Sequence, residues 1–408
     1  MIRHASLFSQ LIALFSRQKF YELVFRHKSE RYSKGFNSWD HFVAMLFCQL
    51  AQAKSLREIC GGMACCMGKL RHLGMKDAPN KSTLSYANAH RPWPMFKELF
   101  YETLSFCKKA APGKHKFRFR NKLLTLDSTI IPLCLSLFPW AKFRRTKGAV
   151  KLHLLLDHDG YLPTYAYISN GKRPDVSVAR KVLFAPGSIV VMDRGYNDYK
   201  LFARWTENQI YFVTRLKDNA DYIVIAEKEL PQNRNVLADQ FILFAGYQAQ
   251  KNCPQVLRRI VVWDKENKKE IVLLTNHFDF GATTIAAVYK DRWQIELFFK
   301  ALKQNLKVKT FVGTTENALY IQIWTALIAM LLIKYLQFKS KLGWSLSNLV
   351  AFLRWNLFTY RNLWEWIDSP FDTLPIVPKS VQYPIPFRGF GQHLSLRTTP
   401  SPESKEST

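Results

Sequence analysis

Apolar residues recur at helical spacing through about the first 110 residues of the chain. The runs at 11–15 and 42–47 show this period, and Ser38 or Asp40 is placed to cap the second of these helices. The pattern predicts a helical N-terminal domain over residues 1–110. Shorter helical segments within it are expected at 55–59 and 82–91, with glycines between them.

Beyond this domain the pattern changes to strands that alternate with helices. Residues 116–120 alternate basic and aromatic side chains at the period of a strand, and an Asp-His-Asp-Gly turn at 157–160 predicts a β-hairpin. Asp175 is expected to cap a helix that runs to Leu183. These strands and helices predict a mixed α/β layer over residues 111–220. Its further strands are expected at 123–127, 150–157, 162–168, 188–193 and 210–214, with a helix at 199–208.

The pattern returns to strands alone over residues 221–275, which predicts a β-rich insertion. Its clearest strands are 259–263 and 270–274. A long helix from Thr283 to Lys307 then begins a second α/β part. This second α/β part is expected to span residues 276–340. The segment 341–370 follows with a C-terminal helix at 345–367, and residues 371–408 form a Pro/Ser-rich extended tail.

The most apolar stretch of the chain covers residues 319–334. Gln322 and Lys334 bracket an uninterrupted apolar run that is well short of the roughly 20 residues needed to cross a bilayer. A short helix that is apolar on all sides is more typical of the centre of a large protein core. We therefore expect no membrane partner.

Charge narrows the class of partner. The chain has 59 Lys+Arg and 31 Asp+Glu, a difference of +28, and its aromatic content of 14% excludes a disordered basic tail. A polyanion, most simply a nucleic acid, is the expected partner. The second short helix is a candidate for DNA contact, the alternative being a solvated scaffold face. Its polar side chains are Lys81, Ser82, Thr83, Ser85, Asn88 and Arg91.

Cysteine usage indicates a reducing compartment. The chain has seven Cys, an odd number, and no secretory leader is evident at its start. Cys60, Cys65, Cys66 and His72 do not match the spacing of common zinc sites, so ordinary buried thiols are expected there. These features predict a cytoplasmic protein.

Two carboxylates follow apolar strands in a chain that is poor in acids. Asp127 is expected to end one buried strand and Asp193 another. Active sites of open α/β sheets form at the carboxyl ends of strands, so both residues are candidates for chemistry. The alternative for either residue alone is a helix or turn cap.

A third carboxylate lies in a basic helical segment. Glu296 is flanked by cations at helical spacing, and a single carboxylate among such cations suits a metal ion beside a nucleic-acid backbone. The alternative is a set of surface ion pairs between residues four apart, which does not account for the aromatic residues nearby. The predicted face is made of Tyr289, Arg292, Glu296, Lys300 and Lys303.

These residues resemble a known family. Tyr289-x2-Arg292-x3-Glu296-x6-Lys303 is similar to the Tyr–Arg–Glu–Lys signature of bacterial insertion-sequence transposases of the IS-four family. The segments 127–129 and 191–196 resemble its two Asp motifs, and Lys151-x-His153 with Asp157-x-x-Gly160 resembles its second-strand region. The resemblance spans about residues 120–310.

The resemblance implies a catalytic triad of Asp127, Asp193 and Glu296 on a ribonuclease H-like core. The spacing between the last two, 296 − 193 = 103 residues, is long for that fold, and the β-rich insertion accounts for it. The three carboxylates are expected to hold two Mg²⁺ ions, for which Mn²⁺ substitutes. The expected reaction is cut-and-paste transposition through a DNA hairpin.

The resemblance also implies DNA contacts around this triad. Tyr289, Arg292 and Lys303 are expected to grip phosphates, with Lys300 and Arg194 beside them. A hairpin needs a base turned out of the helix, and an aromatic ring is a natural platform for it. The candidate platform is Trp263 on the inserted hairpin, with plain core packing as the alternative, and Trp293 is expected to lie under the active-site face.

The expected partners are double-stranded DNA, as the terminal inverted repeats of a transposon and a target, and a second copy of the chain on that DNA. Two other functions stay open. One is a ribonuclease H-like nuclease that only hydrolyses DNA. The other is a catalytically silent protein that binds transposon ends.

Overall fold

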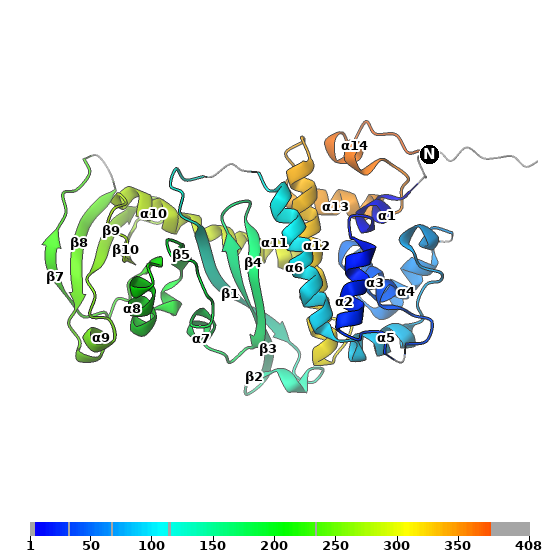
Figure 1. Ribbon diagram of the computed structural model, residues 1–408, viewed down its shortest axis with the longest axis horizontal. Coiled ribbons are helices and arrows are strands. Elements are labelled where there is room, and N and C mark those ends of the chain that lie inside the picture. The colour runs from blue at the N-terminus through cyan, green and yellow to red at the C-terminus, as the bar shows by residue number, and fades with distance from the viewer. Residues whose placement is uncertain (1–4, 32, 67, 113–115, 233–234, 377–408) are drawn as a thin grey trace, which may run out of the picture.

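The computed structural model describes residues 5–31, 33–66, 68–112, 116–232 and 235–376. A ten-stranded mixed sheet lies at one end of the molecule and a helical body at the other (Figure 1). The predicted mixed α/β class and the helical N-terminal region are therefore confirmed. Most of the predicted Pro/Ser-rich tail lies outside the described residues.

The helical body joins both ends of the chain around one core. Helix α12 lies at its centre, beside α6, and side chains of the N-terminal and C-terminal helices pack into the same apolar cluster (Figure 1). The predicted boundary near residue 110 therefore does not separate two cores. The body consists of α1 (Leu7–Ile12), α2 (Arg17–Arg26), α3 (Ser38–Leu50), α4 (Leu56–Ala64), α5 (Lys81–His90), α6 (Trp93–Ala110), α12 (Glu316–Lys339), α13 (Leu346–Asn356) and α14 (Leu363–Asp368).

Helix α12 is the one described helix that is long and apolar enough to cross a membrane. The mean hydropathy of its most apolar window is 1.7, and 83% of that window is buried inside the protein. Burial on this scale is what a core helix of a globular protein requires, because its apolar surface faces other side chains on all sides.

The sheet places antiparallel strands on both sides of a parallel centre. Its order is β4-β3-β1-β5-β6-β10-β9-β8-β7, with β2 against the end of β3. The pairs β1–β5 and β5–β6 are parallel, whereas β1–β3, β3–β4 and β6–β10 are antiparallel. The strands are β1 (Leu123–Leu133), β2 (Lys142–Arg144), β3 (Lys147–Asp157), β4 (Leu162–Asn170), β5 (Ile189–Met192), β6 (Tyr211–Arg215), β7 (Tyr222–Glu227), β8 (Val236–Phe244), β9 (Leu257–Asp264) and β10 (Lys269–Thr275).

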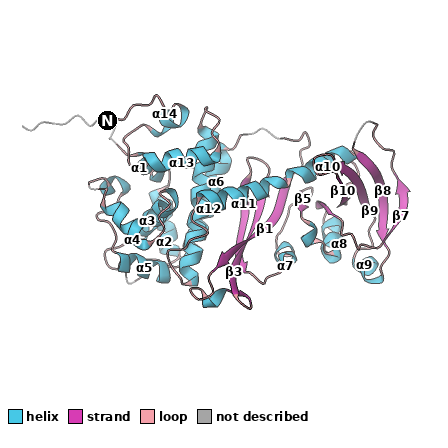
Figure 2. Cartoon of the chain, turned by 180° about the vertical axis from the view of Figure 1, so that it is seen from behind, coloured by secondary structure: helices cyan, strands magenta, loops and turns pink. Residues whose placement is uncertain are grey.

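Helices cover both faces of this sheet, as Figure 2 shows from behind. One face packs against α7 (Asp175–Ala179), α8 (Tyr199–Glu207) and α9 (Tyr247–Asn252). The other packs against α10 (Ala282–Asp291), and α11 (Trp293–Asn305) continues from it onto β1 and β3. Strands β7–β10 occupy the predicted insertion, and β10 pairs with β6, so they extend the central sheet.

Two predicted helices are divided. The helix expected from Thr283 to Lys307 is α10 and α11, separated at Arg292. The N–H groups of Arg292 and Ile295 bond three residues back rather than four, which tightens the chain at this point. The single helix expected at 345–367 is α13 and α14.

Other local predictions were wrong in their boundaries. Asn37, rather than Ser38 or Asp40, caps α3, because its side-chain oxygen accepts the Asp40 N–H at 2.8 Å. Asp175 is the first residue of α7 and not its cap, because its carboxylate is held by other partners, which are described below. This helix ends at Ala179 rather than Leu183. Residues 116–120 form bends instead of a strand.

Candidate active site

The two aspartates lie beside each other where the parallel pairing of the sheet stops. The last pair between β1 and β5 is Leu126 with Met192, and Asp127 and Asp193 are the next residues on each strand. The prediction that Asp127 ends its strand was wrong, because β1 continues to Leu133 by pairing with β3 alone. The two carboxylates nevertheless meet at one edge of the parallel centre.

Helix α11 brings the third carboxylate to this edge through an arginine. Arg292 Nη1 lies 3.4 Å from Asp127 Oδ2 and 3.3 Å from Glu296 Oε1. The side chains of Arg292 and Asp127 are 13% and 17% exposed, so this bridge is largely shielded from water. One guanidinium thus joins the candidate acids of β1 and α11.

Burial shapes the charge of this site. Burial raises the pKa of Asp127 to about 7, and the negative charges of Glu296 and Asp193 act in the same direction. The Ser128 N–H and the Arg292 guanidinium oppose this increase. The three carboxylates therefore share one electrostatic environment, which favours the binding of positive charge.

Two tyrosines complete the surroundings of the carboxylates. The Arg292 guanidinium lies 5.7 Å from the ring centre of Tyr289, and burial raises the pKa of that phenol. Tyr196 is buried behind the aspartates, and burial together with the charge of Asp127 raises its pKa well above the usual value. Both phenols stay protonated at neutral pH.

The two lysines of the predicted face differ in their surroundings. Lys303 Nζ donates to Thr129 Oγ1 at 2.6 Å and to the Ile130 carbonyl at 3.0 Å, so it fastens α11 to β1. Lys300 is exposed, and it has no hydrogen bond or ion pair in the part of the chain that the structure describes.

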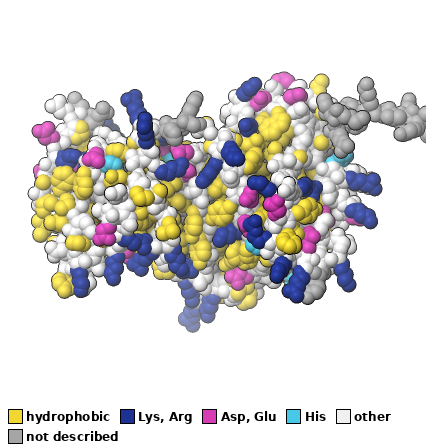
Figure 3. All heavy atoms as spheres, in the orientation of Figure 1, with side chains coloured by type: hydrophobic (Ala, Val, Ile, Leu, Met, Phe, Trp, Pro, Cys, Tyr) yellow, Lys and Arg dark blue, Asp and Glu magenta, His cyan; other side chains and the backbone are white. Residues whose placement is uncertain are grey.

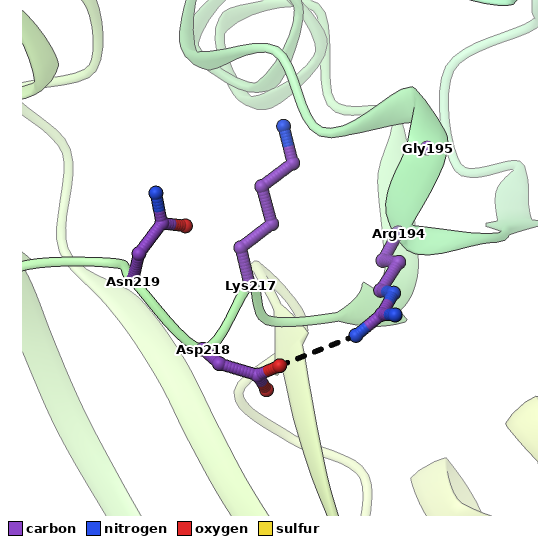
Figure 4. A pocket seen from close by; sticks show the side chains of 5 residues that line it. All are labelled: Arg194, Gly195, Lys217, Asp218 and Asn219. Carbon is purple, nitrogen blue, oxygen red and sulfur yellow. Dashed lines mark hydrogen bonds and ion pairs between the residues drawn. The ribbon is translucent and has the colours of Figure 1, made fainter.

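Arg194 lines an open cavity of about 450 Å³ directly after Asp193. Figure 4 shows Arg194 and Lys217 on neighbouring segments of its lining, with Gly195 and Asn219 beside them. Arg194 Nη1 pairs with Asp218 Oδ2 at 3.3 Å (Figure 4). The lining carries two cations and one carboxylate, and the resulting net positive charge suits a phosphate backbone.

The two tryptophans of the predicted site lie at the surface. Trp263 is 39% exposed on β9, three strand positions from β5, which corresponds to roughly 14 Å at the usual strand spacing. Trp293 is 57% exposed at the start of α11 and does not lie beneath the site. Neither tryptophan has a described contact with the three carboxylates.

Sequence reasoning missed a polar network behind Asp127. Asp175 accepts a hydrogen bond from Ser128 Oγ at 2.6 Å and pairs with Lys151 Nζ at 3.1 Å. His153, fully buried, lies 3.5 Å from the same carboxylate. The Lys151-x-His153 motif was visible in the sequence, but nothing in the sequence connects it with Asp175 or Ser128.

A second buried cluster supports the junction of α10 and α11. Asp291, whose side chain is 1% exposed, binds His158 Nδ1 at 2.6 Å and Lys116 Nζ at 2.5 Å, and Tyr161 Oη donates to it at 3.2 Å. These charges lower the pKa of Asp291 although burial acts in the opposite direction. The cluster fixes the residue that precedes Arg292.

The donor chemistry of this site fits a hard divalent cation only in part. Carboxylate oxygens are the ligands that such ions prefer, and three carboxylates share this electrostatic environment. Within the described residues, however, no three His, Cys, Asp or Glu side chains lie close enough together to hold one metal ion. Arg292 stands between Asp127 and Glu296 as the positive group. The carboxylates therefore suit a cation in type, and Arg292 has to yield for them to converge on it.

Comparison with known proteins identifies the family. The family model described as a transposase DDE domain matches residues 118–332, more than half of the chain. The chain belongs to the DDE transposase family. A second model, described as a domain of unknown function, matches residues 3–76.

Curated relatives agree with this family. The chain is 32% identical over 275 residues to the "Probable transposase for insertion sequence element IS5377" of Geobacillus stearothermophilus, covering 67% of this chain and 72% of that one. It is 32% identical over 282 residues to y4zB of Sinorhizobium fredii, also named as a transposase, covering 68% and 77%. The DDE domain thus lies in an enzyme that acts on DNA.

Among solved structures, the chain is similar to the piggyBac transposase in its synaptic complex with hairpin DNA. The identity is 12% and the TM-score 0.40, with 86% of this chain and 79% of that one covered. A likeness at this level does not define the fold of the DDE domain.

Proposed function

We propose that this DDE transposase excises and integrates an insertion sequence by a cut-and-paste route through a DNA hairpin. The observation that carries the proposal is the bridge that Arg292 makes between Asp127 and Glu296, with Asp193 directly after the neighbouring parallel strand. These carboxylates are proposed as the catalytic and metal-binding residues. A hard cation would be held by oxygen ligands of this kind.

The strand order supports a ribonuclease H-like core. Strands β4-β3-β1-β5-β6 run in the order third, second, first, fourth and fifth along the chain, and the second strand is antiparallel to its neighbours. The first, fourth and fifth strands are parallel. We propose that β7–β10 are an insertion into this core, placed between its last strand and the helix that carries Glu296.

Divalent ions, two Mg²⁺ or Mn²⁺, would supply Lewis acidity and activate water or a 3′-hydroxyl when bound at the three carboxylates. The residues of the chain perform the remaining tasks. Arg292 keeps Asp127 and Glu296 at one place in the metal-free protein, and when it moves aside its guanidinium becomes a donor for a phosphate oxygen. Tyr289 lies against the same guanidinium and limits its movement.

The cations near the site are proposed to position the DNA. Arg194 and Lys217 face the cavity that follows Asp193, and Lys300 is exposed on α11. Lys303 is proposed to act by holding α11 on β1 as well as by its charge. Trp263 remains the proposed platform for a flipped base, a role that requires the DNA to extend from the carboxylates to the insertion.

The proposed partners are the terminal inverted repeats of the element, a target duplex and a second copy of the chain on that DNA. The polar face of α5 is proposed to contact the repeats, because Lys81, Ser82 and Ser85 are exposed on it. Asn88 and Arg91 of the predicted set are buried and bind within the protein, so they are not part of this face. We propose that the protein works in the bacterial cytoplasm, on the nucleoid.

The test uses the full chain, Mg²⁺ and a duplex carrying the inverted repeats that flank the coding region. Blunt excision followed by joining to a second duplex supports transposition. Cleavage without joining favours the nuclease that only hydrolyses, and binding without cleavage favours the silent end-binding protein. Either of these results contradicts the proposed function.

A further inference from the structure

A cavity of about 370 Å³ lies where the helical body meets the catalytic core. Lys334 and Gln337 of α12 form one wall, and His158, Tyr161 and Lys116 form the other. This cavity is separate from the one beside Arg194. It borders the Asp291 cluster, which precedes Arg292 in the chain, so it adjoins the junction that positions the candidate active site.

Lys334 is the unusual group in this cavity. All residues of α12 from 321 to 333 are buried, and Lys334 follows them as a part-buried ammonium. No hydrogen bond or ion pair of Lys334 exists within the described residues. Burial lowers its pKa, with no acid to oppose the effect.

The other basic side chains around the cavity already have partners. Lys116 pairs with Asp291, and His158 binds Asp291 through Nδ1 and Thr125 Oγ1 through Nε2, the latter at 2.6 Å. A part-buried charge without a partner is costly to the fold, and an apolar residue would continue the surface of α12 at lower cost. An ammonium at this position therefore points to an anionic ligand.

A row of cations leads from the cavity along the segment that enters β1. Arg118 and Arg120 are exposed and lack described partners, whereas Phe117 and Phe119, which alternate with them, point inward and stack at 5.2 Å. Phe119 also packs on Phe280 at 4.8 Å, which fixes the segment. Figure 3 shows Lys and Arg side chains at the surface between the sheet and the helical body.

We propose that this cavity binds a phosphate group of the DNA backbone, with Lys334 as its main ligand and Arg118 and Arg120 contacting the phosphates that follow. The inference rests on the proposed function, since it requires that the protein act on DNA. It adds a contact between the DNA and the helical body, close to the junction of α10 and α11.

The test measures binding of the full chain to a labelled duplex over a series of salt concentrations. Lys334→Gln and Lys334→Met are compared with Lys339→Gln and Lys339→Met, which change an exposed lysine of the same helix. Each lost phosphate contact lowers the slope of log K against log salt by about 0.9. We expect this decrease and an affinity loss of about fivefold to tenfold for both Lys334 variants, and neither for the controls.

Thermal unfolding of the DNA-free protein gives a second measurement, in which the expected change is an increase in Tm rather than a loss. Lys334→Met removes an unpaired part-buried charge, so its Tm without DNA is expected to rise while its DNA affinity falls. A higher Tm with unchanged affinity and slope would show a purely structural lysine and would overturn the inference. If the wild-type chain itself shows no salt-dependent DNA binding, the proposed function fails together with the inference. If the wild type binds DNA with the expected salt dependence and both Lys334 variants bind as the wild type does, the inference alone fails.

Discussion

A buried ion pair fastens β8 and β9 to the loop that leads into α10. Arg258 of β9 and Asp239 of β8 have side chains that are 1% and 4% exposed. Arg258 Nε and Nη2 donate to the two carboxylate oxygens of Asp239 at 2.7 and 2.6 Å. Its Nη1 donates to the carbonyls of the loop that leads into α10, namely those of His277, Phe278 and Phe280.

Asp239→Ala is expected to destabilise the protein by about 3–5 kcal/mol, because it leaves the Arg258 guanidinium buried without a counter-charge. The loop carbonyls accept hydrogen bonds but do not neutralise the charge. The assay is urea denaturation of the metal-free chain, followed by tryptophan fluorescence and by circular dichroism. Coincidence of the two transitions shows whether a single free energy of unfolding describes the protein.

The matched control is Glu266→Ala, which removes the partner of Lys290 in an exposed pair whose side chains are 73% and 74% exposed. Exposed pairs contribute about 0–1 kcal/mol, so this variant should remain close to the wild type. A second variant, Asp239→Leu with Arg258→Met, removes both charges and should recover part of the loss. If Asp239→Ala cost less than about 1 kcal/mol, the account of this pair would be wrong.

The remaining predictions concern the core of the helical body, helix α11 and the carboxylate of Asp127. His41 is buried against Asn88, and burial lowers its pKa to about 3. The folded state then binds fewer protons than the unfolded state below pH 6.5, so stability falls as the pH decreases. From pH 6.5 to 4.5 the loss is about 2 kcal/mol, and urea midpoints should show a smaller loss for His41→Gln than for the wild type. Lys303→Met removes two hydrogen bonds to β1 and should cost about 1.5–3 kcal/mol in the same assay, whereas Lys300→Met should change stability by less than about 0.5 kcal/mol. An equal effect of the two lysine variants would contradict the role given to Lys303. The raised pKa of Asp127, about 7, means that the folded metal-free protein retains a proton there which the unfolded chain has lost above pH 4. Its stability should therefore decrease between pH 4 and pH 7, and the Tm of Asp127→Asn relative to the wild type should rise from pH 5 to pH 8. A constant difference in Tm would refute this pKa.

Sequence patterns predicted those elements that depend only on residues close together in the chain. The turn at 157–160 joins β3 to β4 as expected, and Gly160 adopts a φ of +80° there, which a side chain would strain. The strands 259–263 and 270–274 pair as β9 and β10. The break at Arg292 was not predictable in the same way, because it belongs to a residue that reaches carboxylates on two elements.

In the candidate site, too, short-range relations were predictable from the sequence and long-range contacts were not. The spacing of Tyr289, Arg292 and Glu296 placed them near one another, since four residues make about one helical turn. The adjacency of Asp127 and Asp193 followed from the expectation that both follow buried strands. The network of Asp175 was not accessible, because its partner Ser128 is 47 residues away in sequence and no periodicity relates them.

The central claim is that Asp127, Asp193 and Glu296 together carry out DNA cutting and joining. The most direct measurement is strand joining in Mg²⁺ on a duplex with the flanking inverted repeats, for the wild type and for Glu296→Gln. The account predicts excised and joined products from the wild type, and DNA binding without any product from Glu296→Gln. Normal cutting by Glu296→Gln would contradict it.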